Sequence, residues 1–145
     1  MRKYITPCIL LMALILICGC GKKRPQTFNP VSNPSWSTFE IRKDINFNQA
    51  WQTINDILID NYQLEFINQD IGYVRTSWRY GYNEDYEGKY RSMVEIKFSP
   101  DQNTIKIRTT SHYKEDDDYW VEGTDSKLIS SLKSDILGHI GRTSR

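Results

Sequence analysis

The hydrophobic residues of the chain follow three patterns of different period. The first is an uninterrupted apolar run from Ile9 to Cys18, without a single charged residue. A helix that crosses a bilayer needs about 20 apolar residues, whereas about 7–15 suffice for the core of a signal peptide. Because Arg2 and Lys3 precede the run, it predicts an N-terminal signal peptide over residues 1–19.

The second pattern has the period of an amphipathic helix, with apolar residues three and four positions apart. One such stripe follows Asn46 and Asn48, either of which is a favourable N-cap. A second stripe near the C-terminus follows Thr124 and Asp125, again two candidate caps, and has Gly138 and Gly141 near its end. The two stripes predict two helices with their apolar faces in the core. Their apolar residues are Phe47, Trp51, Ile54, Ile57, Leu58 and Tyr62 in the first, and Leu128, Ile129, Leu132, Ile136 and Ile140 in the second.

The third pattern alternates with a period of two and predicts strands with one buried face. In the segment 91–99, for example, Val94, Ile96 and Phe98 share one face. The order of strands and helices is then β-α-β-β-β-β-α. This order predicts an α+β fold: a two-layer sandwich in which two helices pack on an antiparallel sheet of about 4–5 strands. The segments that alternate are 38–42, 64–68, 73–78, 91–99 and 104–113.

The segment between the signal peptide and the first strand differs in composition. Pro25, Pro30 and Pro34 occur among polar residues, and no apolar period is visible. We therefore expect residues 20–37 to be a flexible tether, whose 17 residues after position 20 could span roughly 50 Å at about 3.1 Å per residue. Residues 38–141 form the predicted folded domain, which is long enough to bury one core without disulfides.

All three cysteines, Cys8, Cys18 and Cys20, lie in the first 20 residues. The sequence Ile17-Cys18-Gly19-Cys20 resembles the lipobox of bacterial lipoproteins. The resemblance implies cleavage after Gly19, a diacylglycerol on the sulfur of Cys20 and an acylated amino group, and hence anchoring in the cell envelope. Gly21, in place of an aspartate, implies the outer membrane with the domain facing the periplasm. The chain after Cys20 would have no cysteine for a disulfide or a thiolate nucleophile.

The net charge of the chain bears on whether it binds a nucleic acid. The 145 residues carry a formal charge of +1, and removal of Arg2 and Lys3 with the signal leaves 17 basic against 18 acidic side chains, about −1. A nucleic-acid-binding protein needs a basic surplus, so we expect no nucleic-acid partner.

Candidate catalytic and metal-binding groups are sparse. Neither His112 nor His139 has a partner at metal-ligand spacing, and the acidic run 114–118 lacks the alternating spacing of a calcium loop. No nucleophile elbow or phosphate-binding glycine loop occurs. We therefore predict no catalytic residue, no metal site and no cofactor: a protein that is not an enzyme.

Aromatic residues gather near two predicted loops, among glycine, asparagine and acidic residues. Rigid rings with polar tips are typical of contact surfaces, although the same rings could instead cover the edge of the sheet. The candidate interaction surface consists of Tyr80, Tyr82, Tyr86, Tyr90, Tyr119 and Trp120.

Several motifs of the domain resemble the repeated domain of the BamC (NlpB) lipoproteins, over about residues 38–141. The resemblance implies a strand, a helix, an antiparallel sheet and a long final helix, and a role as an accessory of outer-membrane β-barrel assembly. The chain differs from that family in having one such domain and a short tether. The matching motifs are Phe47 to Trp51, Leu58, Asn61-Tyr62, Phe66, Asp70, Gly72 and Thr76 to Trp78.

The function that these observations favour is a membrane-anchored envelope lipoprotein that presents a small interaction domain to an envelope protein, as an accessory or scaffold of envelope assembly. Two alternatives stay open. One is a periplasmic lipoprotein that binds a small ligand between the long helix and the sheet. The other is a hydrolase or its modulator, which would use acidic side chains and His112.

Overall fold

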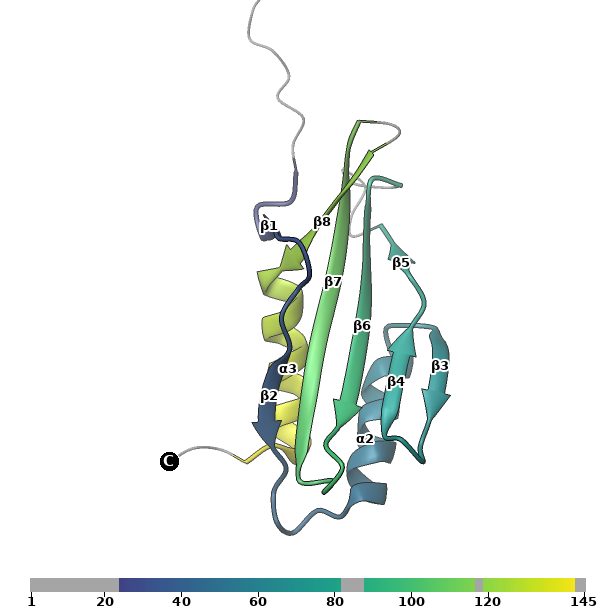
Figure 1. Cartoon of the computed structure of the whole chain (residues 1–145), viewed down its shortest axis with the longest axis vertical. Coiled ribbons are helices and arrows are strands. Elements are labelled where there is room, and N and C mark those ends of the chain that lie inside the picture. The colour runs from purple at the N-terminus through teal and green to yellow at the C-terminus, as the bar shows by residue number, and fades with distance from the viewer. Residues whose placement is uncertain (1–23, 82–87, 117–118, 143–145) are drawn as a thin grey trace, which may run out of the picture.

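In the part of the chain that the structure describes, one antiparallel sheet of eight strands packs against two helices (Figure 1). The computed structural model describes residues 24–81, 88–116 and 119–142. The α+β class is confirmed, but the expected number of four to five strands is too low. The elements are β1 (Phe28–Pro30), β2 (Ser37–Glu40), α2 (Phe47–Ile59), β3 (Leu64–Asn68), β4 (Tyr73–Thr76), β5 (Arg79–Tyr80), β6 (Tyr90–Phe98), β7 (Thr104–Asp116), β8 (Tyr119–Asp125) and α3 (Ser126–Ile140).

The sheet is organised around the hairpin of β6 and β7, which pair from Tyr90↔Tyr113 to Phe98↔Ile105. The strand order is β1-β8-β7-β6-β4-β3, with β2 also on β7 and β5 also on β6. The strands missing from the sequence prediction are β1, β5 and β8. Two of them are only two or three residues long, which is too short for alternation to be recognised.

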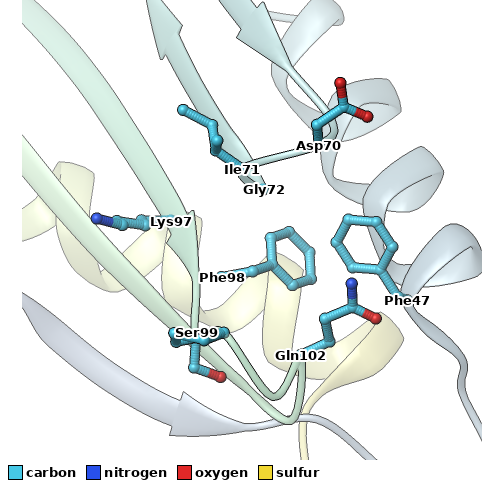
Figure 2. Close-up of a pocket in the computed structure, with 9 residues that line it drawn as sticks. Phe47, Asp70, Ile71, Gly72, Lys97, Phe98, Ser99 and Gln102 are labelled. Atoms are coloured by element: carbon cyan, nitrogen blue, oxygen red, sulfur yellow. The ribbon is translucent and has the colours of Figure 1, made fainter.

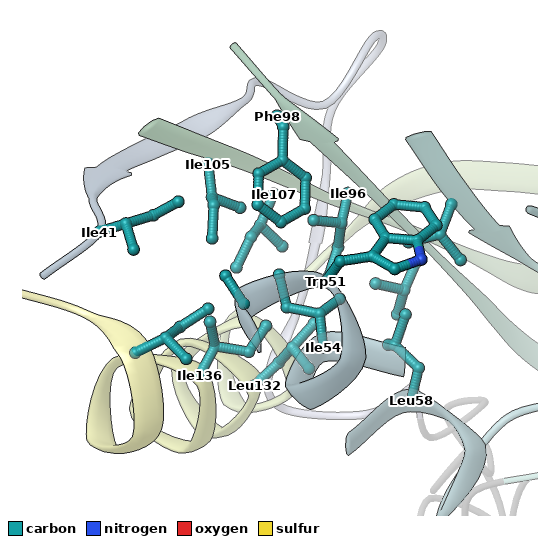
Figure 3. Close-up of a cluster of buried hydrophobic side chains, with 14 residues drawn as sticks. Ile41, Trp51, Ile54, Leu58, Ile96, Phe98, Ile105, Ile107, Leu132 and Ile136 are labelled. Atoms are coloured by element: carbon teal, nitrogen blue, oxygen red, sulfur yellow. The ribbon is translucent and has the colours of Figure 1, made fainter. Parts of the chain in front are cut away.

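Both helices cover the same face of the sheet, because side chains from both share one apolar core with β4, β6 and β7 (Figure 3). Trp51 and Ile54 of α2 are buried in it, as predicted. The N-caps are Asn46, in a capping box with Gln49, and Asp125. Among the described residues no helix covers the opposite face of the sheet, which we call the open face.

The N-terminal part of the domain corrects the prediction of a flexible tether over residues 20–37 where the structure describes it, from residue 24 onward. Phe28 is 3% exposed, and β1 pairs with β8 in the register Phe28↔Asp125. The ring of Phe28 packs edge-on against Tyr90 and also against Tyr113, with centroids 6.4 and 6.1 Å apart. A single buried aromatic ring removes enough apolar surface from water to dock a short strand. One ring does not produce a hydrophobic pattern in the sequence, so this strand could not be predicted. The signal peptide 1–19 and Cys20 lie outside the described residues.

Candidate interaction surface

The open face is defined by the alternation of the two central strands. In each, one set of side chains points to the helices and the other set forms the open face. Cross-strand pairs therefore form rows, such as Lys97 with Lys106, Glu95 with Arg108, and Arg91 with His112. The open-face residues are Arg91, Met93, Glu95 and Lys97 on β6, and Lys106, Arg108, Thr110, His112 and Lys114 on β7.

One row of the open face holds a cluster of aromatic rings around Arg91. The guanidinium carbon lies 4.4 Å from the ring centroid of Trp78 and 4.3 Å from that of Trp120. Its Nη1 donates a hydrogen bond of 3.0 Å to the hydroxyl of Tyr80. Stacking of a guanidinium on aromatic faces is attractive and holds both groups in fixed orientations. We refer to Trp78, Tyr80, Arg91, His112 and Trp120 as the Arg91 cluster.

His112 fixes the position of Arg91 from the neighbouring strand. The Nε and Nη2 atoms of Arg91 lie 3.2 and 3.0 Å from Nδ1 of His112, and the imidazole ring stacks 4.4 Å from Trp78. A guanidinium can only donate, so Nδ1 must carry the lone pair. Burial and the positive charge of Arg91 both lower the pKa of His112, while Glu122 opposes them. The neutral ring is therefore the form that fits this arrangement.

A second polar cluster lies two rows away, around Glu95. Arg108 donates two hydrogen bonds to this carboxylate, of 2.7 and 2.9 Å, and the hydroxyl of Tyr73 donates a third, of 2.7 Å. Burial alone would raise the pKa of Glu95, but the hydrogen bonds from Arg108 and Tyr73 outweigh it and hold the pKa below its usual range. Burial and the bond to Glu95 raise the pKa of Tyr73 to about 12. Trp36 stacks on Arg108 at 4.5 Å.

The structure separates the six residues of the predicted surface. Tyr80 and Trp120 lie together in the Arg91 cluster, with ring centroids 6.4 Å apart, and Tyr80 is 55% exposed. Tyr119 is 65% exposed at the start of β8. Tyr82 and Tyr86 lie outside the described residues.

Of the members that the structure describes, Tyr90 does not fit that prediction, because a residue of an interaction surface must be accessible. It is 1% exposed and faces the helix side of the sheet. Its hydroxyl lies 2.8 Å from Oδ2 of Asp125 and 3.1 Å from Oγ of Ser111. The alternation of β6 explains the error, because Tyr90 shares its parity with the core residue Val94, whereas Arg91 has the opposite parity.

The residues that the sequence analysis missed are Trp36, Trp78, Arg91 and Arg108. Three of the four tryptophans thus lie on the open face, and Trp51 alone is in the core. Arg91 and Arg108 alternate with the apolar positions of their strands, and this pattern in the sequence predicts that they lie on the open face. The contact of Trp36 with Arg108 cannot be predicted from the sequence, because it depends on how β2 docks on β7.

Two cavities bear on the small-ligand alternative. One of about 360 Å³ lies where the edge-to-face pair Phe47 and Phe98 meets the loop residues Ile71 and Gln102, while Lys97 extends away from the two rings (Figure 2). Another of about 420 Å³ lies between the helices and β5, with Tyr62, Arg79, Lys127, Leu132 and Asp135 in its wall.

The parts of the chain that the structure describes hold neither a metal-binding cluster nor a membrane-spanning helix. There, no group of three or more potential ligands among His, Cys, Asp and Glu gathers in a way that could hold a metal ion. Neither α2 nor α3 has the length and apolar character needed to cross a bilayer.

No known family model matches this chain, and no curated protein is similar to it in sequence.

Proposed function

We propose that the protein is a membrane-anchored envelope lipoprotein that binds a protein partner through its open face and catalyses no reaction. The Arg91 cluster carries the proposal. It presents two tryptophans, a tyrosine and an arginine on a sheet face that no helix in the described part of the chain covers. Trp, Tyr and Arg are the residues that most often dominate binding energy at protein interfaces.

The internal contacts of the cluster also favour binding. Arg91 is held by two rings and by hydrogen bonds to Tyr80 and His112. Immobilising a free, rotamer-rich side chain on association costs about 0.5–1.5 kcal/mol. Because these side chains are already ordered, a partner would meet a surface on which much of that cost does not arise.

The anchor is the second part of the proposal, together with a location at the outer membrane and a role as an accessory of envelope assembly. It rests on the lipobox at Cys20 and on the motifs that resemble the BamC domain. Incorporation of a clickable fatty acid tests it: the wild-type protein should be labelled and Cys20→Ser should not. Continued labelling of Cys20→Ser would refute lipidation at this cysteine.

Site-specific photocrosslinking in intact cells tests the binding surface. A photoreactive residue in place of Tyr80 should yield a discrete crosslinked product, and the same residue in place of the exposed Ser130 on α3 should not. Adding Trp120→Ala to the Tyr80 probe should reduce the product, because half of the stack on Arg91 is then lost. Equal products from positions 80 and 130 would contradict a partner on the open face.

Small-ligand binding is the second candidate function, and the cavity of about 420 Å³ favours it. Its wall combines the cations Arg79 and Lys127 and the carboxylate of Asp135 with the apolar Leu132, a combination that suits a small molecule bearing both a carboxylate and a positive charge. Mass spectrometry of molecules that copurify with the wild type but not with Arg79→Ala tests this candidate. Without such a molecule the cavity is a surface depression only.

A further inference from the structure

The central strands carry an uneven charge on the open face. Over the stretch in which β6 and β7 pair with each other, their open-face positions hold four cations, Arg91, Lys97, Lys106 and Arg108, against one carboxylate, Glu95. This surplus stands against a net charge of about −1 for the chain after residue 20. A partner of the open face must therefore accept a surface that is far more positive than the rest of the protein.

Most charges of the open face already have partners. Arg108 is neutralised by Glu95, and Arg91 is fixed within its cluster. At the flanks, Glu40 pairs with Arg142 at 2.9 Å and Glu65 pairs with Arg75 at 3.2 Å. In one row of the central strands, however, the charges are not balanced by such a pair.

That row is the direct cross-strand pair of Lys97 and Lys106. Both lysines are exposed, and their outer neighbours in the row are the uncharged Tyr73 and Thr38. No ion pair joins either lysine to another of the residues that the structure describes. Directly opposite residues have Cβ atoms about 4.5–5.5 Å apart, and like charges in such a pair destabilise the sheet. An anion placed between the two ammonium groups would remove this repulsion.

The spacing of the cations suits an extended chain. Open-face residues of one strand repeat about every 6.6–6.8 Å, so Lys106 and Lys114 lie about 26 Å apart. An extended peptide carries its alternate side chains at the same interval. Acidic side chains at alternate positions could thus meet the Lys97–Lys106 row while the rest of the segment reaches the Arg91 cluster.

The borders of the face favour a single strand over a broad polyanion. Glu40, Glu65 and Glu122 lie on the flanking strands β2, β3 and β8. Because Glu40 and Glu65 are paired with Arg142 and Arg75, and Glu122 is itself acidic, these borders add no net positive charge for a flat anionic membrane or a nucleic acid. A narrow segment over β6 and β7 instead lies on the cations of the central strands. We propose, building on the function proposed above, that the partner presents an extended acidic segment whose carboxylates bind the Lys97–Lys106 pair.

Fluorescence anisotropy with the full-length lipoprotein in a nonionic detergent tests the proposal. The probe is a labelled nine-residue peptide of alternating Glu and Thr, compared with the same peptide of Gln and Thr, at about 50 mM salt. The Glu peptide should bind more tightly than the Gln peptide. Lys97→Gln with Lys106→Gln should weaken its binding roughly fivefold to tenfold, since each exposed pair contributes modestly. The matched control Lys133→Gln on α3 should not weaken it.

Two results would overturn the acidic segment. One is binding of the Glu peptide that the double variant leaves unchanged. The other is tighter, equally lysine-dependent binding of anionic vesicles or of a single-stranded oligonucleotide. The photocrosslink at position 80 separates this inference from the proposed function. A product at position 80 without peptide discrimination rejects the acidic segment alone, whereas lysine-dependent peptide binding without that product rejects only the protein partner at the Arg91 cluster.

Discussion

Tyr90 and Tyr80 lie ten residues apart on opposite faces of the sheet, and substituting each should affect a different property. The hydroxyl of Tyr90 lies 2.8 Å from Oδ2 of Asp125, a side chain that is fully buried. The other oxygen of Asp125 caps α3 by accepting hydrogen bonds from the backbone N–H groups of Lys127 and Leu128, at 2.9 and 3.1 Å. Tyr90→Phe removes the hydroxyl and leaves Oδ2 without this donor.

The expected cost follows from these contacts. A hydrogen bond to a buried charged group contributes about 1.5–3 kcal/mol. Because Oδ1 keeps both backbone donors, Tyr90→Phe should lower the free energy of unfolding by about 2 kcal/mol. For a domain of this size that corresponds to a fall in Tm of roughly 8 °C. Tyr80→Ser removes an exposed ring and one surface hydrogen bond, so its cost should stay below about 1 kcal/mol.

Urea unfolding, followed by circular dichroism on the chain from Gly21, measures the stability of both variants. Crosslinking to the proposed partner from a photoreactive residue at the exposed position 119, which leaves position 80 free for the substitution, measures binding once it is normalised to folded protein. Tyr90→Phe should lower the stability and leave binding unchanged. Tyr80→Ser should weaken binding and leave the stability nearly unchanged. The burial argument would be refuted if Tyr90→Phe cost less than about 0.5 kcal/mol, or if it reduced binding per folded molecule.

Three further predictions concern the strand β1, the core and pH. A Cβ on residue 123 would lie only 2.7 Å from the ring of Phe28, so Gly123→Ala should undock β1, which faster hydrogen exchange of residues 24–31 would report. Trp51→Ala should cost about 3–5 kcal/mol through the cavity it leaves, and an unchanged thermal midpoint would contradict its placement in the core. The pKa of His112 is lowered from 6.5 by burial and by Arg91. The unfolded chain therefore takes up this proton first, and stability should fall as pH drops below about 6.5 towards the folded pKa. His112→Gln should lose that part of the pH dependence between pH 7 and 5.5 when both proteins are unfolded in urea.

The sequence was sufficient for the elements that repeat over several turns or residue pairs. The stripe through Trp51 and Leu58 predicted α2, and the alternation through Val94 and Ile96 predicted β6 together with its buried face. The N-caps of the two helices, Asn46 for α2 and Asp125 for α3, were each one of two candidates in the sequence, because a cap acts locally through its own side chain. Periodicity thus identified the main layers of the fold.

The parts that were not predicted depend on contacts between distant segments. Phe28 looked like an isolated residue in a proline-containing stretch, and only its docking against Tyr90 and Tyr113 makes it part of the core. The Arg91 cluster likewise joins β5, β6, β7 and β8, and no local spacing brings Trp78 beside Trp120. Tyr90 has the composition of a contact residue near a loop, but its position in the alternation of β6 places it on the buried face.

The docking of β1 also limits where a partner can be. With Cys20 lipidated as proposed, only eight residue steps separate the anchor from Phe28, at most about 29 Å of extended chain. The prediction of a 17-residue tether had allowed roughly 50 Å at about 3.1 Å per residue. Trp120 precedes Asp125, the partner of Phe28 in the ladder, by five residues, or about 17 Å along β8. Together with the spacing between β1 and β8, this would place the Arg91 cluster within about 50 Å of the bilayer surface, so the proposed partner must either be embedded in the same membrane or expose the proposed acidic segment close to it.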